Sequence, residues 1–306
     1  MELKWCGENA ECGRGEKRPV LRWGNPPAGV YNVPIYFALA QSWLNAEEVG
    51  VAEHRNGPEY AQGVAGGRVD VGQMGSPVLL RLMERDPTVI VIGQGCVVES
   101  PFVLLVRPGV DARRGLVGRK IAINRRYSCP DTLLRGYLKS AGLPDGSVEV
   151  VLAGDNETMV RWISEGRVDA VVWWEPFVSW LVNGLGWQAA ARGEGIGRRR
   201  YYAFFLYARE EVLARWEERV RSLCVGYWRA VEAIKAEPGR ALKVAREYFP
   251  GIPERILGAA LEEEARRWGH RNEFLAERLE ESMKELVDLG HVERRFEWQG
   301  RVRLVV

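Results

Sequence analysis

The stretch GRVDVGQMGSP at 67–77 indicates how this chain is organised, because it joins the end of one expected helix to a short strand and a further helix. Glycine can adopt the left-handed conformation that ends a helix, and the residues at 69–73 are typical of a strand. The phrase GRVD recurs at 166–169, before the apolar run at 170–173. Two interpretations are open: coincidence between two common helix-to-strand turns, or two lobes built to one plan. The flanking elements also repeat, which favours two lobes.

Outward from these two stretches, short β-branched runs alternate with longer segments of helical periodicity. This alternation is typical of a mainly parallel sheet whose strands are joined by crossover helices. In the first half we expect strands at 20–24, 49–55, 69–73 and 88–93, and helices at 34–45, 60–66 and 77–84. After a linking run at 102–106, we expect strands at 120–124, 148–152 and 170–173, and helices at 131–141 and 156–165.

The C-terminal third has a different pattern, in which one apolar run at 201–207 is followed by helices only. Apolar residues at three- and four-residue steps through 210–235 predict one long helix with a continuous buried face. We therefore predict an α/β protein of two lobes, since 306 residues exceed one ordinary core. The predicted divisions are lobe 1 at 18–105, lobe 2 at 106–202, and a return to lobe 1 at 203–306, with C-terminal helices that pack on lobe 1. We expect the hinge near 100–107 and 200–206.

The composition is that of a soluble globular protein, with 46% hydrophobic and 27% charged residues. A net charge of +2 makes nucleic acid an unlikely partner, and no apolar run is long enough to span a membrane. Five cysteines do not indicate a disulfide framework, and no cofactor or metal is expected. The N-terminus lacks the features of a secretory signal. Either the chain is cytoplasmic, or a leader is missing from this numbering.

Candidate ligand contacts are sought in the loops after strands, where parallel sheets bind ligands and helix N-termini offer unpaired N–H groups. Each candidate also has a purely structural interpretation. Asn25 and Ser76 would then be capping residues, Ser100 part of an ordinary turn, and the arginines solvated. Five loops supply the candidate binding residues Asn25, Tyr31, Ser76, Ser100, Asn124, Arg125, Tyr127, Ser128, Trp174 and Glu175.

Two of these loops carry the sharpest expectations. NRRYSCPD at 124–131 gathers cations, hydroxyls and a helix N-terminus, which makes it the strongest anion-binding candidate. WWEPF at 173–177 ends a strand with bulky rings, and aromatic walls are common in ligand clefts. We expect Trp174 rather than Trp173 to face the ligand. Glu175 would favour a cationic or hydroxylated ligand, or hold the lobes closed.

Four stretches resemble a known family: VDVGQMGSP at 69–77, ESPFVLLVRPG at 99–109, GRKIAIN at 118–124 and GRVDAVVWWEPF at 166–177. They are similar to the extracytoplasmic receptors of the nitrate, aliphatic-sulfonate, taurine and thiamine-precursor ABC importers. The resemblance implies a type II periplasmic binding protein fold, with two βα lobes, a double crossover and the ligand in the cleft between the lobes. It also implies an ABC permease partner and an extracytoplasmic location.

The ligand expected from this resemblance is a sulfonate, a thiamine-precursor-like heterocycle or a related anion or zwitterion, with an acidic or zwitterionic ligand preferred. We expect a monomer that closes on one such molecule. The loops at 25–31 and 174–175, together with Ser76, Ser100 and Ser128, match the loops that touch ligands in the family.

Two other functions fit the same lobes. Enzymes of this fold group include a yeast-type pyrimidine synthase, aromatic desulfinases and decarboxylases. The chain has three histidines, His54, His270 and His291, and none lies in a predicted cleft loop. Only Cys129 lies near such a loop, without an evident basic partner, so we expect no catalysis. A cytoplasmic ligand sensor would have the same lobes and is the remaining alternative.

Overall fold

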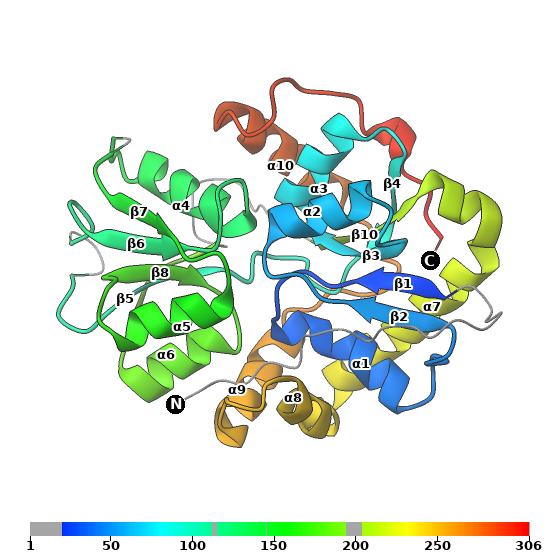
Figure 1. Cartoon of the computed structure of the whole chain (residues 1–306), viewed down its shortest axis with the longest axis horizontal. Helices are drawn as coiled ribbons and strands as arrows, with labels where there is room; N and C mark the ends of the chain where they lie inside the picture. Colours follow the sequence, from blue (N-terminus) through cyan, green and yellow to red (C-terminus); the bar gives the residue numbers. More distant parts are fainter. Residues whose placement is uncertain (1–19, 112–114, 145, 194–203, 306) are drawn as a thin grey trace.

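The computed structural model describes residues 20–111, 115–144, 146–193 and 204–305. Figure 1 shows two lobes side by side, each built on one sheet with helices around it. The two five-stranded sheets formed by these residues confirm the expected α/β class and the two-lobed architecture. Within these residues, no helix is long and apolar enough to cross a membrane.

The sheet of lobe 1 has the strand order β2-β1-β3-β10-β4, and the sheet of lobe 2 has the order β7-β6-β8-β5-β9. Four strands of lobe 1 come from the first part of the chain and the fifth, β10, comes from the last. The strands of lobe 1 are β1 (Leu21–Gly24), β2 (Val49–Ala52), β3 (Val71–Gly75), β4 (Val89–Gln94) and β10 (Phe204–Arg209). Those of lobe 2 are β5 (Val103–Val106), β6 (Lys120–Ile123), β7 (Glu149–Leu152), β8 (Ala170–Trp173) and β9 (Gln188–Arg192).

The chain crosses between the lobes twice, after β4 and after β9. β5 runs antiparallel to β8 and β9, and β10 runs antiparallel to β3 and β4. The first crossing therefore lies at 95–102, earlier than the expected hinge at 100–107, because Val103 already pairs in the second sheet. The second sheet thus begins before residue 106. Of the second expected hinge, 200–203 lie outside the described residues.

The repeated phrase GRVD has the same structural role in both lobes. Gly67 and Gly166 both adopt left-handed backbone conformations at the end of a helix, with φ of 65° and 66°. In lobe 1, the Asp70 carboxylate accepts a hydrogen bond of 2.8 Å from the main-chain N–H of Arg22, on the neighbouring strand. In lobe 2, Asp169 accepts a bond of 3.0 Å from the N–H of Lys120. The two lobes are therefore built to one local plan.

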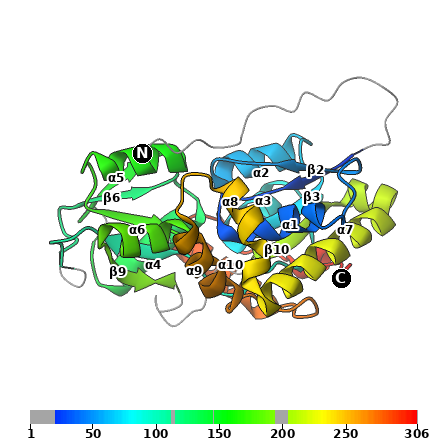
Figure 2. The same cartoon turned by 90° about the horizontal axis from the view of Figure 1, so that it is seen from below.

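Helices cover both sheets, and several C-terminal helices return to lobe 1 as expected. α7 contacts α1, and α10 contacts α3, while α9 contacts both α8 and α6 of lobe 2 (Figures 1 and 2). Those before the second crossing are α1 (Val33–Ala40), α2 (Gly57–Ala65), α3 (Ser76–Arg85), α4 (Cys129–Ser140), α5 (Asn156–Ser164) and α6 (Phe177–Leu185). Those after it are α7 (Glu210–Ala236), α8 (Leu242–Tyr248), α9 (Glu254–Ala265) and α10 (Ala276–Asp288).

Candidate ligand-binding site

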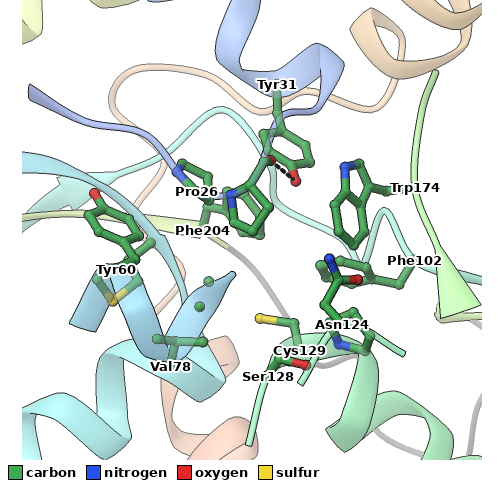
Figure 3. A pocket seen from close by; sticks show the side chains of 15 residues that line it. Pro26, Tyr31, Tyr60, Val78, Phe102, Asn124, Ser128, Cys129, Trp174 and Phe204 are labelled. Carbon is green, nitrogen blue, oxygen red and sulfur yellow. Dashed lines mark hydrogen bonds between the residues drawn. The ribbon is translucent and has the colours of Figure 1, made fainter. Parts of the chain in front are cut away.

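A cavity lies between the two lobes, and both lobes contribute to its wall (Figure 3). It encloses about 410 Å³ between atoms, but the centres of water-sized molecules fit in only about 30 Å³ of it. The lobes are therefore close together in this conformation. The lining residues are Pro26, Pro27, Tyr31, Gly57, Tyr60, Met74, Gly75, Val78, Phe102, Asn124, Ser128, Cys129, Pro130, Trp174 and Phe204.

Hydrogen bonds join the lobes along one edge of this cavity. The indole N–H of Trp174 donates to the carbonyl oxygen of Ala28 at 2.9 Å, and the N–H of Val30 donates to the carbonyl oxygen of Glu175 at 3.1 Å. Nearby, the Asn56 amide donates to the Gly154 carbonyl at 3.0 Å. Each bond links an element of lobe 1 to a loop of lobe 2, so separating the lobes would break all three.

A second set of contacts joins the lobes through α3 and the segment after α10. The guanidinium carbon of Arg81 lies 3.8 Å from the centre of the Tyr127 ring. His291, which follows α10, is buried; its Nδ1 lies 3.3 Å from Thr132 Oγ1 and its Nε2 lies 3.5 Å from the Asp131 carboxylate. Burial lowers the pKa of His291 to about 4, although Asp131 acts to raise it, so the imidazole is neutral at pH 7.

Four of the expected binding residues line the cavity: Tyr31, Asn124, Ser128 and Trp174. Tyr31 lies in a short 3-10 helix (Val30–Asn32), and its hydroxyl donates to the Pro27 carbonyl at 2.8 Å. The Tyr31 and Trp174 rings are 6.5 Å apart, one from each lobe. Trp174 lines the cavity, whereas Trp173 stacks on Phe177 at 4.2 Å inside lobe 2. The structure thus distinguishes the two neighbouring tryptophans in the way that we expected.

Three other expected residues lie away from the cavity wall because partners inside the protein hold their side chains. Asn25 is buried and accepts a hydrogen bond from the Trp23 indole, while its amide donates to Glu53. The Ser76 hydroxyl is 2.7 Å from that of Ser282 on α10 and does not cap α3. Ser100 is buried at the first crossing, where its oxygen lies 3.4 Å from the N–H of Phe102.

The charged and aromatic residues expected in the fourth and fifth loops also lie outside the cavity lining. Arg125 is exposed, and Tyr127 is at the rim beside Arg81. The Glu175 carboxylate accepts bonds from the N–H and hydroxyl of Ser179, both at 3.0 Å, so it stabilises the start of α6. Glu175 joins the lobes only through its main-chain carbonyl.

The N-terminus of α4, our strongest anion-binding candidate, is occupied by a carboxylate of the protein itself. Asp131 is fully buried and accepts a hydrogen bond of 2.8 Å from the N–H of Tyr127. Arg126 and Arg135 pair with the same carboxylate, at 3.1 and 3.3 Å. The Ser128 hydroxyl donates to the Arg125 carbonyl and caps the N–H of Asp131. These groups therefore satisfy one another rather than face the cavity.

Most of the lining consists of apolar or aromatic residues that we did not expect. Tyr60 comes from α2, while Phe102 and Phe204 lie where the two crossings meet the sheets. The Phe204 ring packs edge-on against Tyr31 at 5.0 Å, and Phe102 packs edge-on against Trp174 at 5.5 Å. An apolar residue at a strand end gives no sequence signal that separates a ligand contact from ordinary core packing.

Cys129 is the nucleophilic side chain in this lining. Burial raises the pKa of its thiol to about 12, although hydrogen bonds from the main chain of Val78 and of Cys129 itself act to lower it. The thiol is therefore protonated at pH 7, and a thiol is a much weaker nucleophile than a thiolate. None of the three histidines lines the cavity. The described part of the site thus lacks the histidine partner of a cysteine enzyme.

Gly75 keeps the cavity open where the two lobes are closest, and Gly75→Ala is expected to weaken ligand binding about tenfold. A Cβ atom at this position would lie 2.7 Å from Cys129 Sγ and 3.1 Å from the Phe204 ring. Isothermal titration calorimetry on the variant tests this expectation. Gly258→Ala on α9 is the control, since no atom lies within 4 Å of its added Cβ. Equal affinity of Gly75→Ala and wild type would show that this position does not limit closure.

Two βα lobes, a double crossover and a cavity between them define the class of the periplasmic binding proteins. The chain belongs to the NMT1/THI5-like family, which matches residues 30–241. A search of curated protein sequences finds no match. The comparison with solved structures, by contrast, finds many similar chains that share this fold.

Three of these structures illustrate the range. The alkanesulfonate-binding protein SsuA from Xanthomonas axonopodis pv. citri, bound to MOPS, has a TM-score of 0.79 at 17% identity, covering 94% of this chain and 99% of that one. A ligand-binding component of an ABC-type import system from Staphylococcus aureus, with zinc bound, gives 0.75 at 16%, covering 94% and 97%. DszB, in complex with biphenyl-2-sulfinic acid, gives 0.66 at 13%, covering 94% and 97%. The chain therefore has the fold of the substrate-binding proteins of ABC import systems, a fold that DszB shares.

Proposed function

We propose that this protein is the substrate-binding component of an ABC importer and that it closes around one small organic ligand. The observation that carries the proposal is the cavity between the lobes, which both lobes line and cross-lobe hydrogen bonds enclose. A ligand enters when the lobes separate and is then buried as they return. Such closure couples occupancy to the shape that a permease recognises.

The lining supports a mainly apolar, neutral ligand such as a heterocycle, rather than the acidic ligand that the sequence led us to prefer. No lysine, arginine, aspartate or glutamate lines the described part of the cavity. An anion buried there would lose its hydration without a countercharge, and that desolvation is costly. Flat aromatic walls from Tyr31, Trp174 and Phe204 suit a planar ring, because they bury a large apolar area.

Closure is expected to make the protein more compact when ligand binds. The ligand is first identified by mass spectrometry of small molecules released on denaturing the purified protein. Small-angle X-ray scattering should then show a smaller radius of gyration for ligand-saturated protein than for protein stripped of ligand. An unchanged radius at saturation, with affinity insensitive to changes in the cavity wall, would contradict the closure mechanism.

The transport role is tested separately from ligand binding. Deleting the gene in its host should abolish high-affinity uptake of the identified ligand, and restoring the gene should recover it. Normal uptake in the deletion strain, together with altered gene expression in response to the ligand, would instead indicate a sensor. Conversion of the ligand by the purified protein would indicate an enzyme.

A further inference from the structure

The Asn124 side chain is the polar group of the cavity whose hydrogen-bonding capacity is unused. It is only 1% exposed, and neither its amide nitrogen nor its amide oxygen has a hydrogen-bond partner within the described residues. A buried polar group without a partner is costly, so such groups are rare unless they have a role. Asn124 thus offers one donor and one acceptor side by side at the cavity wall.

The main chain of Asn124 is fixed, so this amide is presented at a defined place. Asn124 directly follows β6, and its carbonyl oxygen accepts a hydrogen bond of 2.8 Å from the N–H of Gly154. Figure 3 shows the amide beside Phe102, between Trp174 and Ser128. A ligand held against Trp174 would therefore have one edge next to this amide.

Other polar groups of the lining already have partners. The Tyr31 hydroxyl donates to Pro27, and the Tyr60 hydroxyl donates to Gly24 and accepts from Tyr207. The Ser128 hydroxyl donates to the Arg125 carbonyl. Discrimination among ligands by hydrogen bonding consequently depends on Asn124 more than on its neighbours.

We infer that Asn124 determines ligand specificity by pairing with a neutral, planar group that carries an acceptor beside a donor, such as a carboxamide or cyclic amide. This inference rests on the proposed ligand-binding function. The ligand carbonyl would accept from the Asn124 Nδ2–H, and the ligand N–H would donate to Asn124 Oδ1. A carboxylate or sulfonate has no donor for Oδ1, and a hydrocarbon leaves both amide atoms unpaired.

The test compares aromatic probes of one shape by ligand-observed NMR and calorimetry: benzamide, benzoate, toluene and benzamidine. Wild type is expected to prefer benzamide to benzoate and toluene by about tenfold or more, since a buried polar group is left unpaired with the other two. Asn124→Leu should abolish the preference for benzamide over toluene. At pH 8, Asn124→Asp should shift the preference to benzamidine, whose paired N–H donors match a carboxylate.

Matched controls separate recognition from a structural role. Asn183→Leu and Asn183→Asp make the same changes on the exposed side of α6 and should leave all preferences as in wild type. Asn124→Leu should keep or raise the melting temperature, because an apolar side chain of similar size removes the unpaired amide. A large fall in melting temperature, with unchanged probe preference, would mean that Asn124 is structural.

The outcomes also separate this inference from the proposed function. Probe binding that Trp174→Ala weakens, but whose ranking is the same in wild type and Asn124→Asp, would overturn the role of Asn124 and leave ligand binding in the cavity supported. Stronger binding of benzoate than of benzamide by wild type would likewise overturn it. Binding of none of the probes would count against both.

Discussion

Trp174→Ala is expected to weaken ligand binding by about a hundredfold while leaving both lobes folded. Truncation removes a buried aromatic wall, worth roughly 1–3 kcal/mol, and the cross-lobe hydrogen bond from the indole to Ala28, worth about 0.5–1.5 kcal/mol. Together these losses affect the closed, ligand-bound state more than the separated lobes. Calorimetry with the ligand identified from the native protein measures the change directly.

The neighbouring tryptophan supplies the control for this prediction. Trp173 stacks on Phe177, and its indole donates to Asn156 at 3.0 Å, so it belongs to the core of lobe 2. Trp173→Ala should therefore lower the melting temperature strongly, by the roughly 3–5 kcal/mol typical of a truncated core aromatic. Unchanged affinity in a well-folded Trp174→Ala protein would show that the ligand is held elsewhere.

Glu264→Gln is expected to stabilise the protein increasingly as the pH rises from about 5 to 8. Glu264 on α9 is buried, and burial, together with the nearby Glu175 carboxylate, raises its pKa to about 8. The folded state keeps its proton at pH values where the unfolded chain has lost it. Wild-type stability from this group is thus complete below about pH 4.5 and is lost as the pH rises toward 8.

The glutamine variant cannot ionise, so it should not show this loss. Its advantage in free energy of unfolding should reach on the order of 4 kcal/mol near pH 8, measured by urea unfolding across the pH range. Glu262→Gln, an exposed acid two residues earlier on the same helix, is the control and should follow wild type. Parallel pH profiles for wild type and Glu264→Gln would contradict the assignment of a buried, protonated Glu264.

The fold was predictable because its signal is repeated along the chain. Each expected strand in the stretches 20–93 and 120–173 is present, since β-branched runs bounded by glycines leave few other structures. Two elements were not expected, α6 (Phe177–Leu185) and β9 (Gln188–Arg192). β9 is a largely exposed edge strand, QAAAR, and therefore has no alternation of buried and exposed residues to reveal it.

The cavity was less predictable, because sequence position does not reveal which partner satisfies a polar group. Ser76, Asn25 and Glu175 all follow strands, yet each is held by another part of the protein. Apolar wall residues such as Met74 and Val78 look like core residues, since both settings require burial. Asn124 and Trp174 were expected at the cavity because a polar amide and a second tryptophan at strand ends exceed what packing needs.

The position of β10 has a consequence for how the chain folds as it is synthesised. β10 lies between β3 and β4, so the sheet of lobe 1 lacks an inner strand until residue 209 has left the ribosome. All five strands of lobe 2, by contrast, lie within one continuous segment, from Val103 to Arg192. Lobe 2 can therefore be completed first, while β3 and β4 of the nascent chain still have unpaired edges that are prone to aggregation.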